Sequence, residues 1–573
     1  MRHEKVFQGG DRCAVSLPVG FGYAARQRLC EVRSHSGLSG NSAIVKQFPS
    51  PSLDLGTPAF AADKKDFTSQ DELTAFIASL SKTSPSLRVS VIGKSQKGRD
   101  IPMLVFSQTQ DVSPQALMRN GKPTVLIVAM QHGDEPASGE GALAYAKSLA
   151  QGKEGDALSW INVLIVPRAN PDGADAFTKA LANGVDLNKD HFALSTPESR
   201  ALAWVMTEYQ PDVVLDSREY QPAGQWLEKF GALARYDAMI QHAAVPNLSA
   251  KITALGERTF RQSLINTLES NGLSHSGYLT IDTDSKDKGR VEMGNMDVNT
   301  LRNTAGLRNA VSLSFATRGI GLGKAHFARR VYTQFLSMQS LVKATAKNHD
   351  DVMTFRRSVR EETNAQTGQG AIVVRGKALP STVTLSMMDA KTADNVKVNV
   401  EVDSALEIMP VLTRPRPYAY LLPSSEKASV ARLKSLGIDV YQVSEKQTVK
   451  AQQYVLAPQN KPTETAKVPE SGRHVLSHLQ GISLSLEPGY FYIPLNQPLA
   501  NLAVSLLEPE ASGSLLESGA MKMPASSKAS AKKQKAKKAK PAAQSDTKEA
   551  TVGDPLPLYR VQEKPEIAMM VMQ

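Results

Sequence analysis

The stretch Thr124-Val-Leu-Ile-Val-Ala-Met130 runs directly into Gln131-His132-Gly133-Asp134-Glu135-Pro136. Its first seven residues are apolar or β-branched and do not alternate with polar ones, which is typical of a strand buried on both faces of a sheet. Pro136 predicts the start of a helix. A strand that ends where a helix begins is the place at which open α/β sheets bind ligands, so this junction predicts both a fold class and the position of a site.

Similar apolar segments recur along the chain and are separated by helix-like segments. The strand-like runs lie at 89–92, 101–106, 161–166, 212–216 and 311–315, and the helix-like segments lie at 137–150, 198–209 and 325–344. Such alternation indicates an α/β fold, with a mostly parallel mixed sheet and helices on both faces. Beyond residue 360, alternating runs at 371–375, 382–387 and 396–402 indicate antiparallel strands and therefore a β-rich C-terminal region.

Changes of composition divide the chain into four predicted parts. Residues 1–62 lack sustained periodicity and predict an unstructured extension or a mis-started signal region, and residues 63–350 form the α/β domain. Residues 351–510 form the β-rich domain, and 511–573 form a Lys-rich low-complexity linker with a terminal strand at 556–560. Ala59 and Ala61 resemble the end of a secretory signal that lacks its apolar core. We therefore expect a periplasmic or secreted protein, or a cytoplasmic one if the start is as written.

Charge and composition exclude several classes of function. The net charge of +11 over 573 residues is concentrated in 522–548, which holds nine lysines and one aspartate. The nearly neutral body therefore predicts no specific nucleic-acid binding, while the Lys-rich tail is suited at most to an anionic surface. The longest apolar runs are about seven residues, far short of the roughly 20 that span a bilayer. Cys13 and Cys30 are the only cysteines, so a disulfide framework and a thiol nucleophile are excluded downstream.

His132 and Glu135 are the first candidates for chemistry. Three residues apart on a strand–helix turn, they can direct an imidazole nitrogen and a carboxylate at one zinc ion. Taken alone the pair is also compatible with an ordinary surface turn. Two further polar segments strengthen it, because 167–173 (PRANPDG) follows the next strand and 183–190 (NGVDLNKD) comes shortly after.

Together these motifs resemble the carboxypeptidase A-like zinc metallocarboxypeptidases, in particular an exported bacterial branch. The matching order is His-x-x-Glu at 132–135, Asn-Pro-Asp-Gly at 170–173, Gly-x-Asp-x-Asn at 184–188 and Thr-Arg-Gly at 317–319. The resemblance covers about 67–345 and extends to RPRPYAYLLP at 414–423. It implies a zinc cofactor and a peptide or peptide-like substrate that loses its C-terminal residue to a zinc-activated water.

The resemblance also implies roles for single residues. His132 and Glu135 match zinc ligands, and Asn188 matches an asparagine that holds the substrate's terminal carboxylate. Lys189 replaces a family arginine. The lysine keeps the positive charge, but it lacks the planar guanidinium that can donate two hydrogen bonds to one carboxylate. Lys179 aligns approximately with the arginine that polarises the scissile carbonyl.

Two positions depart from the family pattern. Arg218 stands where the family has its third zinc-binding histidine, and a guanidinium has no lone pair for a metal. Ala316 stands where the family has its catalytic glutamate, and alanine cannot carry a proton. One interpretation is that Arg218 takes the place of zinc and pairs with Glu135, which leaves an inactive protein that binds peptide carboxylates or other anions in the same cleft.

The other interpretation is that the protein is an active zinc enzyme. A third zinc ligand would then come from His191 or His275, and Glu219 would be the nearest carboxylate able to replace the missing base. Either histidine is equally compatible with an ordinary surface or supporting role. The sequence leaves both interpretations open.

Overall fold

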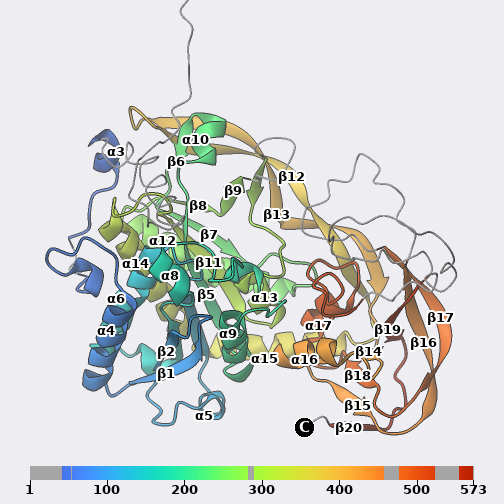
Figure 1. The fold of residues 1–573 in the computed structure, drawn as a ribbon. Helices are drawn as coiled ribbons and strands as arrows, with labels where there is room; N and C mark the ends of the chain where they lie inside the picture. The colour runs from blue at the N-terminus through green and yellow to red at the C-terminus, as the bar shows by residue number, and fades with distance from the viewer. Residues whose placement is uncertain (1–41, 53–54, 282–289, 457–475, 523–553, 572–573) are drawn as a thin grey trace, which may run out of the picture.

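The computed structural model describes residues 42–52, 55–281, 290–456, 476–522 and 554–571 (Figure 1). Cys13, Cys30 and nearly all of the Lys-rich segment lie outside these ranges. Within them the strands form sheets of eight, five and seven strands. The eight-stranded sheet has the order β1-β2-β4-β3-β5-β11-β7-β8. Its strands are β1 Leu87–Lys94, β2 Asp100–Phe106, β3 Thr124–Ala129, β4 Asn162–Val166, β5 Val213–Tyr220, β7 Ala238–His242, β8 His275–Gly277 and β11 Val311–Arg318.

The centre of this sheet is parallel. Strands β4, β3, β5 and β11 are parallel neighbours. Strand β1 pairs antiparallel with β2, β2 with β4 and β7 with β11, and β8 runs parallel to β7. Along β3, Val125 and Ile127 face one apolar cluster while Leu126 and Val128 face another. Both faces of the strand are therefore covered, which explains why its sequence does not alternate.

Helices cover both faces of the sheet. On one face lie α4 Gln70–Thr83, α6 Pro136–Ala150, α12 Gln262–Ser270 and α14 Phe327–Lys347. On the other face lie α5 Pro114–Arg119, α9 Pro197–Glu208 and α13 Leu301–Leu307. The predicted α/β fold, with a mostly parallel mixed sheet between two helical layers, is confirmed. The other helices are α3 Ser42–Gln47, η1 Pro58–Phe60, α7 Ala157–Trp160, α8 Pro171–Ala176, η2 Leu187–Lys189, α10 Gln225–Phe230, α11 Ala250–Leu255, η3 Gly256–Arg261, α15 His349–Ala365, α16 Lys427–Ser435 and α17 Ala500–Leu507.

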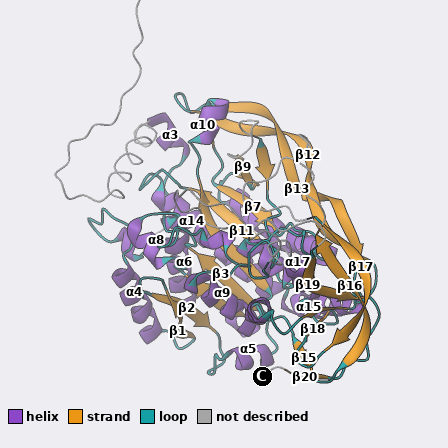
Figure 2. Ribbon diagram, turned by 45° about the vertical axis from the view of Figure 1, so that its right-hand side comes forward, coloured by secondary structure: helices purple, strands orange, loops and turns teal. Residues whose placement is uncertain are grey.

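The C-terminal region adds two sheets, as the β-rich prediction requires. Their orders are β6-β12-β13-β10-β9 and β17-β16-β19-β14-β18-β15-β20. The strands are β6 Ala232–Ala234, β9 Leu279–Ile281, β10 Val291–Met293, β12 Ala371–Asp389, β13 Asn395–Pro415, β14 Ala419–Leu422, β15 Tyr441–Val443, β16 Gln447–Leu456, β17 Ser477–Leu486, β18 Phe491–Pro494, β19 Pro555–Val561 and β20 Met569–Val571. The long β12–β13 hairpin runs along one side of the molecule (Figure 2). Strand β19 confirms the strand predicted at 556–560.

The C-terminal region is closely joined to the α/β part. Strand β12 pairs with β6, and β13 pairs with β10, so strands from both parts of the chain share one sheet. A common apolar cluster contains Phe192 and Leu307 together with Tyr420 and Leu422. The division of the chain at residues 62, 350 and 510 stays a prediction.

Part of the segment predicted to be unstructured packs on the body. Ile44 and Phe48 are buried, and the Ala59 N–H donates to Glu140 Oε1 at 3.0 Å. Ile44, Phe48 and Ala59 do not lie on a periodic apolar face. Their burial arises from packing against residues distant in sequence, so the local sequence pattern does not predict it. In the described ranges, no helix combines the length and apolar character needed to cross a bilayer.

We expect Gly141→Ala to destabilise the fold by about 1–3 kcal/mol because it overpacks the α6–α14 contact. A Cβ at Gly141 would lie 2.4 Å from Gln334 Cβ and 3.3 Å from Phe335 N. Gly256→Ala is the matched control, since its Cβ would meet nothing closer than 3.5 Å. Urea unfolding of both variants measures the difference; equal stability of the two would contradict this account of the packing.

Candidate functional site

The turn that carries His132 and Glu135 is shaped by a close approach of two backbones. Met130 leaves strand β3 with a φ of 50°, and the Gly133 N–H donates to Thr178 O at 2.9 Å. A Cβ at Gly133 would lie 1.9 Å from Gly173 C, so only glycine fits. Glu135 is the N-cap residue of α6, whose first residue is Pro136.

The Asn-Pro-Asp-Gly motif supports this turn. Asn170 Oδ1 accepts from the Gly173 N–H at 2.7 Å, which caps α8, and its Nδ2 donates to Gln131 O at 3.3 Å. Asp172 is engaged elsewhere, accepting from Ser95 Oγ and Arg99 Nη1. The motif therefore holds the candidate ligands in place and does not itself face a ligand.

His132 lies between two carboxylates. Its Nδ1 is 2.7 Å from Glu135 Oε1, and its Nε2 is 2.7 Å from Asp186 Oδ1. Asp186 Oδ2 in turn pairs with Lys179 Nζ at 3.0 Å. Burial and the Arg218 cation lower the pKa of His132, but Glu135 and Asp186 outweigh them and raise it. The ring can donate Nε2–H to Asp186, whereas Nδ1 lies against both the Glu135 oxygen and the Arg218 Nη2 donor.

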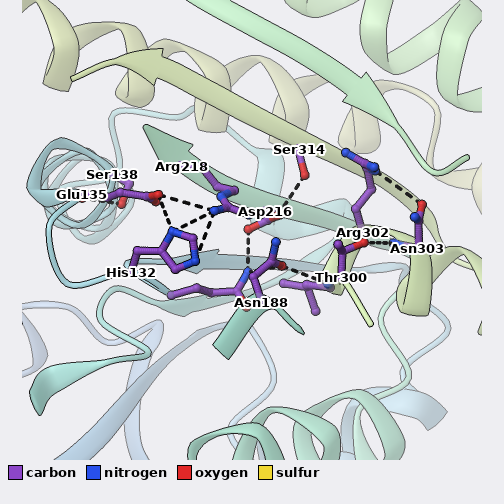
Figure 3. Close-up of polar contacts among 12 residues, drawn as sticks. His132, Glu135, Ser138, Asn188, Asp216, Arg218, Thr300, Arg302, Asn303 and Ser314 are labelled. Atoms are coloured by element: carbon purple, nitrogen blue, oxygen red, sulfur yellow. Dashed lines mark hydrogen bonds and ion pairs between the residues drawn. The ribbon is translucent and has the colours of Figure 1, made fainter. Parts of the chain in front are cut away.

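The Arg218 guanidinium fills the space beside this pair (Figure 3). Its Nη2 lies 2.8 Å from His132 Nδ1 and 3.5 Å from Glu135 Oε1, so the predicted Arg218–Glu135 ion pair is confirmed. Nη1 lies 3.9 Å from Asp216 Oδ2. Burial lowers the pKa of Arg218, but the carboxylate of Glu135 more than compensates and raises it, so the charge is permanent.

These residues do not fit a zinc ion. Zinc needs ligand atoms with free lone pairs, whereas both nitrogens of His132 face carboxylates and the third position carries a cation. Across the described ranges no group of three His, Cys, Asp or Glu side chains is arranged to hold a metal. The roles of His132 and Glu135 as zinc ligands remain a prediction.

The alternative catalytic residues lie elsewhere. Ala316 is the register partner of Arg218 on the neighbouring strand β11 and is buried. Glu219, predicted as a replacement base, points to the opposite face of β5, where it pairs with Arg330 and accepts from the Ala137 N–H. Burial raises the pKa of Glu219 to about 7, although the Arg330 cation acts to lower it. The structure thus brings Glu219 to the α6–α14 layer and not to the Arg218 side of the sheet.

The two histidines considered as a third ligand have other partners. His191 Nε2 lies 2.7 Å from Gln131 Oε1, and burial lowers the pKa of His191 to about 4, so the ring is a neutral donor. His275 Nε2 pairs with Glu269 at 3.1 Å. Neither contacts His132 or Glu135 in the described structure.

Several polar residues of the site were missed by sequence reasoning. Asp216 Oδ1 accepts from Gln131 Nε2 at 2.7 Å, and its Oδ2 accepts from Ser314 Oγ at 2.8 Å. Asp186 lies within the Gly-x-Asp-x-Asn motif, so the sequence offered a signal for it. Asp216 follows a run of apolar residues, and only its hydrogen bonds to Gln131 and Ser314 show that it belongs to the site. Arg302 adds a second buried guanidinium, which donates to Asn295 O at 3.1 Å.

The predicted carboxylate-binding residues differ in exposure. Asn188 is buried, and its Oδ1 accepts from the Leu301 N–H and Gln131 Nε2. Its Nδ2 meets no acceptor among the described residues. Lys189 is exposed, and within the same ranges it has no ion pair. Lys179 is more than half exposed at the rim, beside Asp186.

Comparison with known proteins identifies similar chains. A family model described as zinc carboxypeptidase matches residues 73–220. The protein named carboxypeptidase 2 from Trichophyton rubrum is 27% identical over 511 residues, which is 87% of this chain and 93% of that protein. Its counterpart from Trichophyton equinum is 26% identical over the same shares of the two chains. Carboxypeptidase A from Helicoverpa armigera superposes with a TM-score of 0.38 at 17% identity, covering 56% of this chain and 81% of that one.

We expect Arg218→Gln to raise the pKa of His132, because the arginine cation opposes protonation of the ring. Proton NMR of the histidine ring as a function of pH measures the shift, with His132→Gln to assign the resonance. Lys189→Gln removes a positive charge that makes no described contact and serves as the control. An unchanged or lowered His132 pKa in Arg218→Gln would show that the two groups do not interact as described.

Proposed function

We propose that this chain, which is similar to the zinc carboxypeptidases and metallocarboxypeptidase-like in function, binds the C-terminal carboxylate of a peptide beside Arg218 without a zinc ion. The observation that carries the proposal is the Arg218 guanidinium, whose Nη2 lies 2.8 Å from His132 and 3.5 Å from Glu135. In this proposal a fixed cation on the protein stands in the position that the family gives to a metal.

The groups around Arg218 suit a carboxylate. Arg218 Nη1 has no acceptor closer than Asp216 Oδ2 at 3.9 Å, and Asn188 Nδ2 meets none in the described ranges. Both groups are N–H donors that a carboxylate can accept from, and hydrogen bonds from charged donors are the stronger ones. Lys179 and Lys189 add positive charge at the rim and attract an anion over a longer range. Binding by these donors is not hydrolysis, since Ala316 and Arg218 supply neither a base nor a Lewis acid.

Zinc-dependent hydrolysis of C-terminal residues is the second candidate, favoured by the similarity to proteins named carboxypeptidase 2 over 87% of the chain. It requires Arg218 to leave His132 and Glu135 and a further ligand to approach. Departure would separate a buried ion pair, and removing one partner of such a pair costs about 3–5 kcal/mol.

Zinc content separates the two candidates. After dialysis with zinc and then into zinc-free buffer, we expect far less than one zinc per wild-type chain and about one per chain of Arg218→His, in which an imidazole restores a third ligand. Elemental analysis makes the measurement, and Arg88→His, at an exposed position on β1, controls for an added histidine. Tight stoichiometric zinc in the wild-type chain would refute the metal-free proposal and support hydrolysis.

Peptide binding tests the proposed activity directly. We expect a fluorescent pentaalanine with a free C-terminal carboxylate to bind at least about ten-fold more tightly than its C-terminal amide, because the amide lacks the charge that Arg218 and Asn188 recognise. Asn188→Ala is expected to reduce this preference.

Fluorescence anisotropy at low salt measures both peptides. Lys82→Gln, at an exposed site on α4, is the control for loss of a positive charge and should leave the preference intact. Equal affinity for the acid and the amide would overturn the proposal whatever the zinc content.

A further inference from the structure

A cavity outside the cleft lies between the N-terminal segment 42–52, the loop before β7 and the turn of the β12–β13 hairpin. Its volume is about 270 Å³, below the roughly 300–1,000 Å³ of sites for drug-sized ligands, so it suits a small molecule. Helix α3 lies beside the turn end of the hairpin at this place (Figures 1 and 2). The residues of the cleft around Arg218 do not line the cavity, so the two sites are separate.

The walls of the cavity are fixed by packing and by an ion pair. Phe48 and Met388 are buried in one apolar cluster, which joins the N-terminal segment to the hairpin. On another side, Arg329 donates to both oxygens of Asp237, from Nε at 2.7 Å and from Nη2 at 3.0 Å. Arg329 Nη1 also donates to Pro49 O at 3.3 Å. A ligand therefore meets a preformed site and loses little free energy to ordering its walls.

Two charged side chains of the lining have no partner of their own. Arg235, directly after β6, is half-buried, and Asp394, in the turn between β12 and β13, is exposed. Among the described residues, neither side chain has a hydrogen bond or an ion pair, and the two do not pair with each other. The cavity thus presents one free cation and one free anion within its described lining, beside the neutral Arg329–Asp237 pair.

The strand register keeps these two charges apart. Leu233 of β6 is opposite Met388 of β12, which is itself opposite Asn395 of β13. Neighbouring strands lie about 4.8 Å apart, so Arg235 and Asp394 project from backbones separated by two strand spacings, roughly 10 Å. A single small ligand that carries both an anion and a cation fits the space between such side chains.

We propose that this cavity binds a small zwitterion, the ammonium and carboxylate of a free amino acid or of a dipeptide. The Arg235 guanidinium donates to the carboxylate, for which its planar fork is suited, and the Asp394 carboxylate accepts from the ammonium. Phe48 and Met388 form the apolar part of the lining and contact the side chain of the ligand. A molecule with only one of the two charges gains only one of the two interactions.

Isothermal titration of the full chain tests the site, with L-leucine and L-alanyl-L-leucine as separate probes. Because the cleft also accepts a carboxylate in the function proposed above, each probe is titrated into Arg218→Gln as well as into the wild-type chain. We expect saturable binding of at least one probe to both proteins, and the stronger probe distinguishes a free amino acid from a dipeptide. In Arg218→Gln, the N-acetyl form of that probe, which lacks the cation, and its amide, which lacks the anion, should each bind at least about ten-fold more weakly.

Substitutions in the cavity locate the bound zwitterion. Combined with Arg218→Gln, Arg235→Gln and Asp394→Asn are each expected to weaken binding at least about ten-fold. Neither side chain has a described partner, so the fold should not change. Lys377→Gln and Glu401→Gln remove exposed charges elsewhere on the hairpin and are the matched controls.

Three results would overturn the proposal. They are unchanged affinity in either cavity variant, equal affinity for the zwitterion and both of its singly charged analogues, and no saturable binding of either probe up to about 10 mM. Binding that disappears in Arg218→Gln would also overturn it and would assign the ligand to the cleft. Failure of the peptide proposal, by contrast, leaves binding at this cavity unchanged.

Discussion

A permanent positive charge, buried at the end of strand β5, is the constraint on which the site depends. Arg218 is 9% exposed and cannot lose its proton, so carboxylates must lie near it. Glu135 and Asp216 supply them at 3.5 and 3.9 Å, and Asp186 balances the neighbouring imidazole at 2.7 Å. The acidic groups at this edge of the sheet therefore compensate the charge of the guanidinium.

The scaffold fixes this arrangement through hydrogen-bonded strands. Strands β3 and β5 are direct neighbours, which brings the turn after β3 against residue 218, and β11 is in register on the other side of β5. Gln334 on α14 donates to Arg218 O at 2.6 Å and accepts from Ser217 Oγ at 2.7 Å. Because Gly141 lets α6 approach Gln334 closely, helix packing on the far face contributes to the position of the arginine.

Local patterns were sufficient to predict the sheet and the turn after β3, since each depends on residues adjacent in sequence. The Arg218–Glu135 pair was one of two interpretations that the family resemblance left open. Glu219 was misplaced even though strand alternation directs it away from Arg218. Asp216 could not be recognised, because its role arises from contacts with Gln131 and Ser314, which are distant in sequence. The packing of Ile44, Phe48 and Ala59 on the body could not be recognised for the same reason.

A metal ion and a guanidinium require opposite properties from the residues around them. Zinc is bound by lone pairs and favours a neutral imidazole, whereas a guanidinium is stabilised by carboxylates that are free to accept its N–H groups. With Arg218 Nη2 at 2.8 Å from His132 Nδ1 and 3.5 Å from Glu135 Oε1, the guanidinium occupies the space in which these two side chains would meet a metal. Arg218 in this position and the zinc site that the family resemblance implies therefore exclude each other.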